Sequence, residues 1–390
     1  KISDFISERP KLQDYLPQAL TLFLFAFVIG YFSYNAGYNM EEQGQTTGFS
    51  FLASEAQFDI QFHLIDYHGG MSYGRAYLVG LLNTILVAVL GIFFATILGV
   101  LFGIIRLSSN FLLAKIAEWW VEIFRNVPLL LQLFFWYFAV LRALPLPKES
   151  VFIFDFFILN IKGLYIPEFV WTNFNALFYS IIGSIIIVVF FIFWAKKTQE
   201  KTGKQYSKFY VSLSILIIIP ALSIFIGGVD LMFIHPELKK ISDTIYNYEG
   251  GSKAIPELLA LVFALAIYTS TFIAECVRAG IMGVSKGQKE AAASIGLTTG
   301  QTLRLIIMPQ ALRIIIPPAT NQYLNLTKNS SLAAAIAYPD LVLVFAGTAL
   351  MQTGRAIEIV SITMLSYLSL SITISILMNW YNKKISIKEK

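Results

Sequence analysis

The stretch "EAAASIGLTTGQTLRLIIMP", residues 290–309, is a polar and alanine-rich interruption in a chain that is otherwise strongly apolar. Its first part consists of good helix formers and is followed by Gly296, a residue type that commonly ends a helix in a left-handed turn. Residues 285–288 and 298–301 both fit the Ser/Thr-x-x-Gln pattern of a capping box. We therefore expect a helix, a tight glycine turn and a second helix that ends near Pro309 and feeds the next apolar segment.

The composition around this stretch is that of an integral membrane protein. The 390-residue chain is 56% hydrophobic and only 14% charged, whereas soluble domains carry about a quarter charged residues. The net charge of +5 is spread without a basic run, so nucleic-acid binding is not indicated. One cysteine, Cys276, excludes a disulfide framework, and the three histidines are not at metal-ligand spacing. We expect no metal site.

Membrane-spanning helices need about 20 mostly apolar residues. The hydropathy pattern predicts eight of them, and we expect the long seventh to be broken at Pro317-Pro318. An excess of Lys and Arg on one set of connecting segments places both termini and the 285–309 loop in the cytoplasm. The eight segments are 17–37, 76–106, 112–142, 175–197, 208–228, 255–282, 309–345 and 355–382.

This pattern predicts an organisation in six parts. A short outer hairpin is expected over 151–170 because the stretch is β-branched and aromatic with Gly163 at a turn. The predicted parts are 1–37 (cytoplasmic N-terminus and an extra first membrane helix), 38–74 (a periplasmic segment), 75–142 (the first two core helices), 143–254 (the periplasmic hairpin and an inserted membrane helix pair), 255–382 (the remaining core with the cytoplasmic loop) and 383–390 (a cytoplasmic tail).

The polar hairpin of residues 285–309 suits a docking role. Ala291, Ala292 and Ala293 carry small side chains that permit close approach to a groove on a partner. The alternative is an amphipathic helix lying on the bilayer, but such a helix usually presents large apolar residues on one face. The sequence favours docking on a partner protein, and a helix lying on the bilayer surface stays open as the alternative.

Polar residues inside the apolar segments are candidate functional groups. Thr269 and Ser270 interrupt one segment, and Gln322, Asn325 and Asn329 share a helix face by their i, i+3, i+7 spacing. Interhelical hydrogen bonding is an equal alternative for the first two residues, whereas the denser second run favours a cavity. Amide and hydroxyl groups offer both donors and acceptors, which suits the carboxylate and ammonium of an amino acid.

One charged pair in the apolar segments has a simpler interpretation. Glu275 and Arg278 are three residues apart in an expected helix, so they can pair on the same helix face. We interpret them as a structural salt bridge in preference to a gate.

Several motifs together resemble the ABC importer permeases. The pattern Glu-Ala-Ala, three residues, Gly, nine residues, Ile-x-Leu-Pro of their cytoplasmic loop matches here, with Met308 in place of the leucine. "GRAYLVGLLNTILVAVLGI" (74–92), "FRNVPLLLQLFFWYF" (124–138) and "YTSTFIAECVRAGIMGVSKGQ" (268–288) resemble the first three core helices of polar amino-acid permeases. The extra first helix and the insertion resemble general L-amino-acid permeases. The resemblance implies an all-α integral membrane fold with a type I ABC importer permease core (MetI-like) and a small extracytoplasmic segment.

The resemblance also implies partners and roles. Because the chain has no GxxxxGK[ST] phosphate loop, ATP and Mg²⁺ would be bound by a separate ATPase dimer, with no cofactor in this chain. A second homologous permease subunit, a periplasmic amino-acid-binding protein and the bacterial inner membrane complete the expected assembly. The expected ATPase-coupling residues are Glu290, Ala291, Ala292 and Gly296; the expected substrate-binding residues are Thr269, Ser270, Gln322, Asn325, Asn329 and Ser330.

The favoured function is therefore that of a non-catalytic permease subunit importing L-amino acids by alternating access. Basic-amino-acid permeases resemble this chain but carry acidic residues where it has Gln322 and Asn329, so a broad or neutral-to-mixed substrate range is expected. An ion-coupled secondary amino-acid transporter is the alternative, although neither an internal repeat nor a set of midplane carboxylates supports it. A membrane scaffold is disfavoured by the intramembrane amides.

Overall fold

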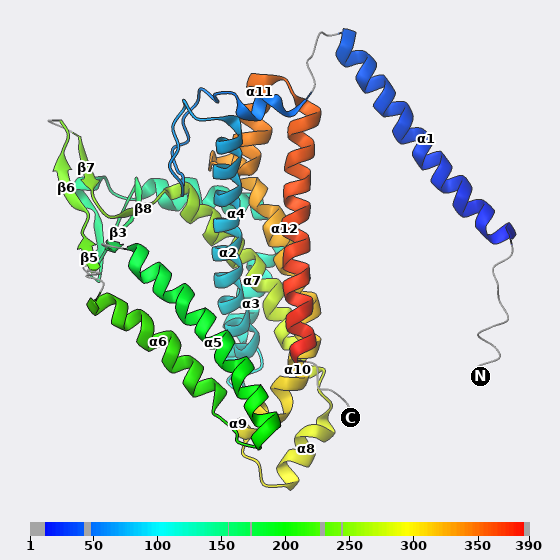
Figure 1. Cartoon of the computed structure of the whole chain (residues 1–390), viewed down its shortest axis with the longest axis vertical. Helices are drawn as coiled ribbons and strands as arrows, with labels where there is room; N and C mark the ends of the chain where they lie inside the picture. Colours follow the sequence, from blue (N-terminus) through cyan, green and yellow to red (C-terminus); the bar gives the residue numbers. More distant parts are fainter. Residues whose placement is uncertain are drawn as a thin grey trace. The chain divides into compact units, whose positions relative to one another are not determined.

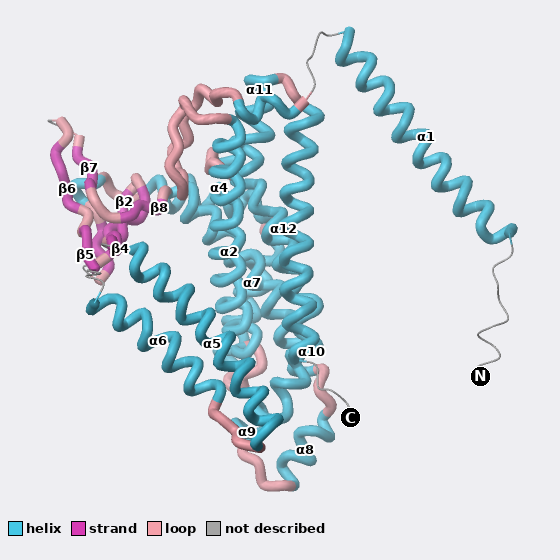
Figure 2. Tube along the Cα trace, in the orientation of Figure 1, coloured by secondary structure: helices cyan, strands magenta, loops and turns pink. Residues whose placement is uncertain are grey.

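The computed structural model describes residues 12–42, 48–154, 156–171, 174–226, 231–242 and 245–385. Helices dominate this part of the chain (Figures 1 and 2). The predicted N-terminal cytoplasmic stretch up to residue 11, and the predicted tail from residue 386 onward, lie outside the described residues. The α-helices are α1 (Leu12–Glu42), α2 (Tyr73–Ile105), α3 (Phe111–Asn126), α4 (Leu129–Phe134), α5 (Phe174–Thr202), α6 (Lys208–Ile226), α7 (Pro256–Met282), α8 (Lys286–Ser294), α9 (Thr299–Thr302), α10 (Met308–Asn329), α11 (Leu350–Thr353) and α12 (Ala356–Ile385).

Within the described residues, five helices are long and apolar enough to cross a membrane, or six if the helices on either side of residues 127–128 count as one interrupted span. The α6 helix and the segment 342–353 are apolar but shorter. Each of the eight predicted segments contains helix, so the multi-pass character is confirmed. The count of eight spans stays a prediction.

The chain divides into two compact units, one formed by Lys1–Val127 with Leu265–Lys390 and the other by Pro128–Ala264. In the first unit, α2 packs closely against α7 because glycine lets the two backbones approach. A Cβ atom on Gly99 would lie 2.5 Å from Cβ of Ile273, and one on Gly280 would lie 2.3 Å from Cγ1 of Ile315 on α10. Small residues at such crossings are typical of membrane helices, where close packing drives association.

The seventh predicted segment is broken, but not at the prolines. The α10 helix runs without interruption through Pro317 and Pro318 to Asn329, so the predicted position of the break is wrong. A 3₁₀ stretch, η6 (Ser330–Ile336), then leads to a left-handed residue, and a π-helical stretch, η7 (Val342–Ala349), resumes the segment. Proline is tolerated in a membrane helix when neighbouring groups satisfy the carbonyls that it frees.

The break is held by polar side chains of α2. Thr84 Oγ1 accepts the backbone N–H of Leu341 at 3.0 Å, and Asn83 Nδ2 donates to the carbonyl of Pro339 at 2.8 Å. The carboxylate of Asp340 accepts a backbone N–H from the first turn of η7 at 2.8 Å. Asn83, Thr84 and Asp340 are fully buried. The irregular backbone therefore has partners inside the protein, as a membrane interior requires.

Residues 48–72 form an outer cap over the ends of α2, η7 and α12. The backbone N–H of Gly48 donates to Glu358 on α12 at 2.6 Å, and Arg355 donates to the Gly48 carbonyl at 2.6 Å. The ring of Phe51, in the 3₁₀ stretch η1 (Phe49–Ala53), stacks on Phe345 of η7 with ring centroids 6.3 Å apart. The cap thus fastens the predicted periplasmic segment to the helix ends.

The second unit contains the α5–α6 pair and short strands gathered at one end of that pair (Figure 2). In the predicted hairpin region, Gly163 begins β3 at a positive φ of 127° and β2 pairs antiparallel with β3. The strands after the helix pair were not predicted: β8 joins a sheet of order β1-β2-β3-β8, while β5 pairs with β4 and β6 with β7. The strands are β1 (Val151–Ile153), β2 (Phe157–Asn160), β3 (Gly163–Ile166), β4 (Glu168–Trp171), β5 (Leu231–Ile234), β6 (Glu237–Lys240), β7 (Tyr246–Glu249) and β8 (Ser252–Ala254).

Candidate functional site: the polar hairpin and the α10 face

The hairpin of residues 285–309 has the predicted order of helix, glycine turn and second helix. The predicted end of the second helix near Pro309 is wrong, because Pro309 lies in the first turn of α10 and the helical backbone continues through it. Gly296 adopts a φ of 79°, and its N–H donates to the Ala293 carbonyl at 3.0 Å while the N–H of Leu297 donates to the Ala292 carbonyl at 3.1 Å. These two bonds are those of a Schellman motif, which satisfies the last carbonyls of α8. A glycine at the left-handed position fixes the direction in which the chain leaves the helix.

Only one of the two predicted capping boxes forms. Thr298 caps α9, with its own N–H donating to Gln301 Oε1 at 2.9 Å. The Ser285 side chain makes no capping hydrogen bond to α8, so that prediction is wrong. A five-residue π-helical stretch, η5 (Leu303–Ile307), joins α9 to α10. The second arm of the hairpin therefore continues directly into a long helix.

The three alanines do not share one face of α8. Consecutive helical residues point about 100° apart, and Ala292 is only 3% exposed because it packs inward. Ala291 is exposed, as are Gly287 four residues before it and Ile295 four residues after it. Ile295 is 74% exposed and was not predicted as a site residue. The outward face of the hairpin is Gly287–Ala291–Ile295, with Glu290 exposed beside it.

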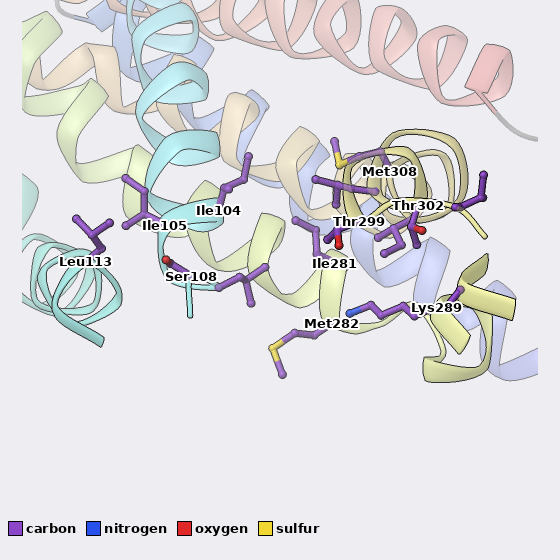
Figure 3. Close-up of a pocket in the computed structure, with 15 residues that line it drawn as sticks. Ile104, Ile105, Ser108, Leu113, Ile281, Met282, Lys289, Thr299, Thr302 and Met308 are labelled. Atoms are coloured by element: carbon purple, nitrogen blue, oxygen red, sulfur yellow. The ribbon is translucent and has the colours of Figure 1, made fainter. Parts of the chain in front are cut away.

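A cavity of about 720 Å³ lies on the inward side of the hairpin (Figure 3). Its walls come from the ends of α2 and α7, the start of α3, the hairpin itself and the start of α10. Figure 3 shows the Lys289 side chain extending from the hairpin toward Met282 at the end of α7. The cavity therefore lies between the hairpin and the ends of α2, α3, α7 and α10.

The predicted substrate residues on α7 are buried within helix packing. Thr269 is 3% exposed and Ser270 is fully buried, with its hydroxyl donating to the Ile267 carbonyl at 2.6 Å. Neither residue lines a described cavity. The arrangement favours the alternative in which these hydroxyls satisfy helix packing.

The amides on α10 occupy a more accessible face. Gln322 is half-buried and lines a cavity of about 300 Å³ together with Arg125, Phe272 and Glu275. Asn325 is exposed and Asn329 is half-buried on the same side of the helix. Ser330 departs from the set, because it is fully buried and its hydroxyl donates to the Thr327 carbonyl at 2.7 Å.

Glu275 forms the predicted salt bridge with Arg278, at 2.5 Å. It also pairs with Arg106, the residue directly after the end of α2, and this second partner was not predicted. Because Arg106 and Glu275 are far apart in sequence, no local spacing could indicate the contact. The ion pairs of Glu275 with Arg106 and Arg278 connect the end of α2 to α7, at a point two helical turns before α7 ends.

Lys328 is a further residue that the sequence reasoning missed. It is exposed in the last turn of α10 and borders a cavity of about 440 Å³ that also contains Ser331, Thr363, Tyr367 and Ser371. Its ammonium group has no hydrogen bond or ion pair with any other described residue. One cation surrounded by hydroxyl groups can bind a carboxylate.

The architecture defines a class before any comparison. Several long apolar helices, an interrupted helix held by buried polar groups and an exposed hairpin on one side are features of a multi-pass membrane transport component. No group of three or more His, Cys, Asp or Glu suited to a metal ion occurs in the described part of the chain.

The chain belongs to the family described as "Binding-protein-dependent transport system inner membrane component", which matches residues 95–387. YhdX of Escherichia coli strain K12 is 48% identical over 98% of this chain and 96% of its own length. The general L-amino acid transport system permease protein AapQ of Rhizobium johnstonii is 45% identical over 98% of this chain and 94% of its length. The glutamate/glutamine/aspartate/asparagine transport system permease protein BztB of Rhodobacter capsulatus is 38% identical over 96% of this chain and 93% of its own length.

This membership confirms the class predicted from the motifs. The chain is a multi-pass inner-membrane permease subunit of an ABC importer, and it is not the ATPase of that importer. Members of the family work with an ATPase and a binding protein. The family assignment decides against the ion-coupled secondary transporter.

Proposed function

We propose that this permease imports L-amino acids of broad or neutral-to-mixed type, and that the outward hairpin face Gly287–Ala291–Ile295 docks into a groove of the ATPase dimer. The proposed docking rests on the contrast along α8, where Ala292 is buried while Ala291 and Ile295 are exposed beside the left-handed turn at Gly296. A protruding apolar side chain next to small residues suits a helix-in-groove contact. Motion of the hairpin would pass directly into α7 and α10, which it connects.

We place the hairpin in the cytoplasm and the outer cap with the short strands in the periplasm, with the six parts bounded as predicted from the sequence. The distribution of Lys and Arg supports this orientation. Single cysteines introduced at Ile295 and Phe152 test it, because a membrane-impermeant thiol reagent on whole spheroplasts should label the second position alone. Labelling of Ile295→Cys from outside would reverse the orientation.

A second, homologous permease subunit is proposed to cover the polar face of α10. Asn321, Asn325 and Lys328 are exposed at i, i+4 and i+7 along a helix of a membrane protein. Unpaired amides and an ammonium group facing lipid are costly, so a partner subunit and a water-filled pathway suit this face better. The amino acid would then cross between the two subunits during alternating access.

Within this pathway, Lys328 would hold the substrate carboxylate, and the amides of Gln322, Asn325 and Asn329 would bind its other polar groups. Thr269, Ser270 and Ser330 would support the packing around them. Amides in place of acidic residues do not select cations, which fits the names of the relatives AapQ and BztB. The proposed range includes neutral and acidic amino acids.

The test is uptake by the importer reconstituted with its ATPase, second permease and binding protein. Radiolabelled L-glutamine should enter, and unlabelled neutral and acidic amino acids should compete. Lys328→Gln should reduce the rate, whereas Lys328→Arg, which keeps the charge, should retain more of it. Exclusive transport of arginine or lysine would contradict the proposed range, and an unchanged rate in Lys328→Gln would remove Lys328 from the site.

A further inference from the structure

The cavity on the inward side of the hairpin has the character of an amphiphile site. Its volume of about 720 Å³ falls within the range of about 300–1,000 Å³ that is usual for small-molecule sites. Most of its walls are aliphatic, including Ile104, Ile281 and Ile307. Among the described residues that line it, Lys289 carries the only charge, and Ser108, Thr299 and Thr302 provide hydroxyl groups.

The position of this cavity follows from the ends of the helices. The α2 helix ends at Ile105, α7 ends at Met282 and α10 begins at Met308, and residues at all of these ends line the cavity. In the proposed orientation these ends lie at the cytoplasmic surface of the bilayer. The cavity is therefore level with the headgroups of the inner leaflet, and part of its aliphatic wall, including Ile104 and Ile281, belongs to the membrane helices α2 and α7.

The charge around the cavity favours an anion. The ammonium group of Lys289 has no acidic partner among the described residues. Residues 285–309 contain Lys286, Lys289 and Arg304 against the single acid Glu290, which gives this segment a net charge of +2. A basic segment at the inner surface of a membrane attracts anionic headgroups.

We infer that this cavity binds an anionic phospholipid, with its phosphate at Lys289 and the neighbouring hydroxyl groups and an acyl chain along Ile104, Ile281 and Ile307. A soluble anion would not require the aliphatic walls, and the ATPase is expected on the opposite face of α8, at Ala291 and Ile295. The lipid separates the hairpin from the ends of α2 and α7. The position of the hairpin, and with it the uptake obtained for each ATP hydrolysed, then depends on the lipid.

Photo-crosslinking in the complete importer tests this inference. The assembled complex is placed in nanodiscs that contain phosphatidylglycerol or phosphatidylcholine with the same diazirine-bearing acyl chain. Peptides that contain Ile281 or Ile307 should be labelled several-fold more by the phosphatidylglycerol than by the phosphatidylcholine. Equal labelling by the two lipids would overturn the proposed charge recognition.

Three variants separate a specific site from general surface charge. Lys289→Gln should reduce labelling by phosphatidylglycerol about fivefold, because the attraction of one basic group to an anionic headgroup strengthens binding by about that factor. Lys286→Gln is the matched control, because Lys286 is exposed on the same helix but does not line the cavity, and its labelling should stay unchanged. Ala293→Phe should fill the cavity and remove labelling by both lipids.

Two results would reject the lipid site. One is equal loss of labelling in Lys286→Gln and Lys289→Gln, which would indicate a diffuse surface effect. The other is a crosslink from a photoreactive residue at position 293 to the ATPase, which would place the ATPase in this cavity. If Ala293→Phe does not assemble, the Lys286 and Lys289 pair carries the test. None of these readouts depends on which amino acid is transported.

Discussion

Gly296 offers the cleanest way to perturb the hairpin without touching the membrane helices. Its φ of 79° lies in the left-handed region, where a residue with a side chain costs about 1–2 kcal/mol. An added Cβ would meet no atom within 4 Å, so Gly296→Ala introduces backbone strain without a steric clash. Strain of this size lowers the population of the native turn by roughly 5–30-fold when the turn has an accessible alternative.

Gly300→Ala is the matched control, because it also adds a methyl group to open space but has no positive φ. Gly300 lies in α9, where alanine is favoured over glycine by up to about 1 kcal/mol. Gly296→Asp also places a side chain at this left-handed position, and it adds a carboxylate at the C-terminal end of α8, where the helix dipole opposes negative charge by about 0.3–1 kcal/mol.

The assay measures amino-acid uptake and ATP hydrolysis in the same proteoliposomes. Gly296→Ala and Gly296→Asp should lower uptake per ATP by about fivefold or more, while Gly300→Ala should stay near the wild-type ratio. Membrane insertion should be normal in all of them, because the substituted positions are exposed outside the spans. Equal losses in Gly296→Ala and Gly300→Ala, or no loss in either, would refute the role of the turn.

Gly99→Ala should lower the melting temperature of the purified complex, because overpacking at this α2–α7 crossing costs about 1–3 kcal/mol. Gly183→Ala in α5, where an added Cβ would meet no atom within 4 Å, should not lower it, because alanine is the better helix former. Glu275→Gln removes the shared partner of two guanidinium groups and should cost about 1–3 kcal/mol in chemical denaturation. Lys239→Gln, which breaks a pair with side chains 56% and 55% exposed, should cost much less. Burial raises the pKa of Tyr67 in the outer cap from 10.0 to about 12. This tyrosine therefore stabilises the folded cap below pH 10, and its contribution is lost as the pH rises from 10 to 12. Tyr67→Phe should reduce the loss of folded cap over this pH range, measured by near-ultraviolet circular dichroism.

The sequence predicted the elements that local chemistry determines. The glycine turn at Gly296 and the capping box at Thr298 depend on residues within one helical turn, and both formed as expected. The Glu275–Arg278 pair is likewise local. Hydropathy located the apolar segments because each must match the thickness of a bilayer.

Elements that depend on long-range partners were not predicted. The break in the seventh segment falls at residues 330–341, where Asn83 and Thr84 of α2 satisfy the backbone, so the two prolines did not decide its position. Strands β5–β8 are three or four residues long and form only against each other or against earlier strands. Their pairing could not be recognised from so short a pattern.

The candidate site was predicted only in outline for the same reason. Polar residue type selected Thr269 and Ser270 together with the α10 amides, although the two α7 residues are buried in helix packing and the amides lie on a more accessible face. Three consecutive alanines suggested a docking face, yet helix geometry divides them, with Ala292 turned inward. Ile295 is exposed because the glycine turn directs the chain away after it, and composition alone does not reveal this.

Site-specific crosslinking between the hairpin and the ATPase tests the account most directly. With Cys276 replaced by serine to leave no native thiol, a cysteine at position 291 and one at position 293 are compared in the assembled importer using a short thiol-reactive linker. The account predicts a crosslink from Ala291→Cys to the ATPase and none from Ala293→Cys. A crosslink from position 293 alone, or from neither position in an active complex, would contradict it.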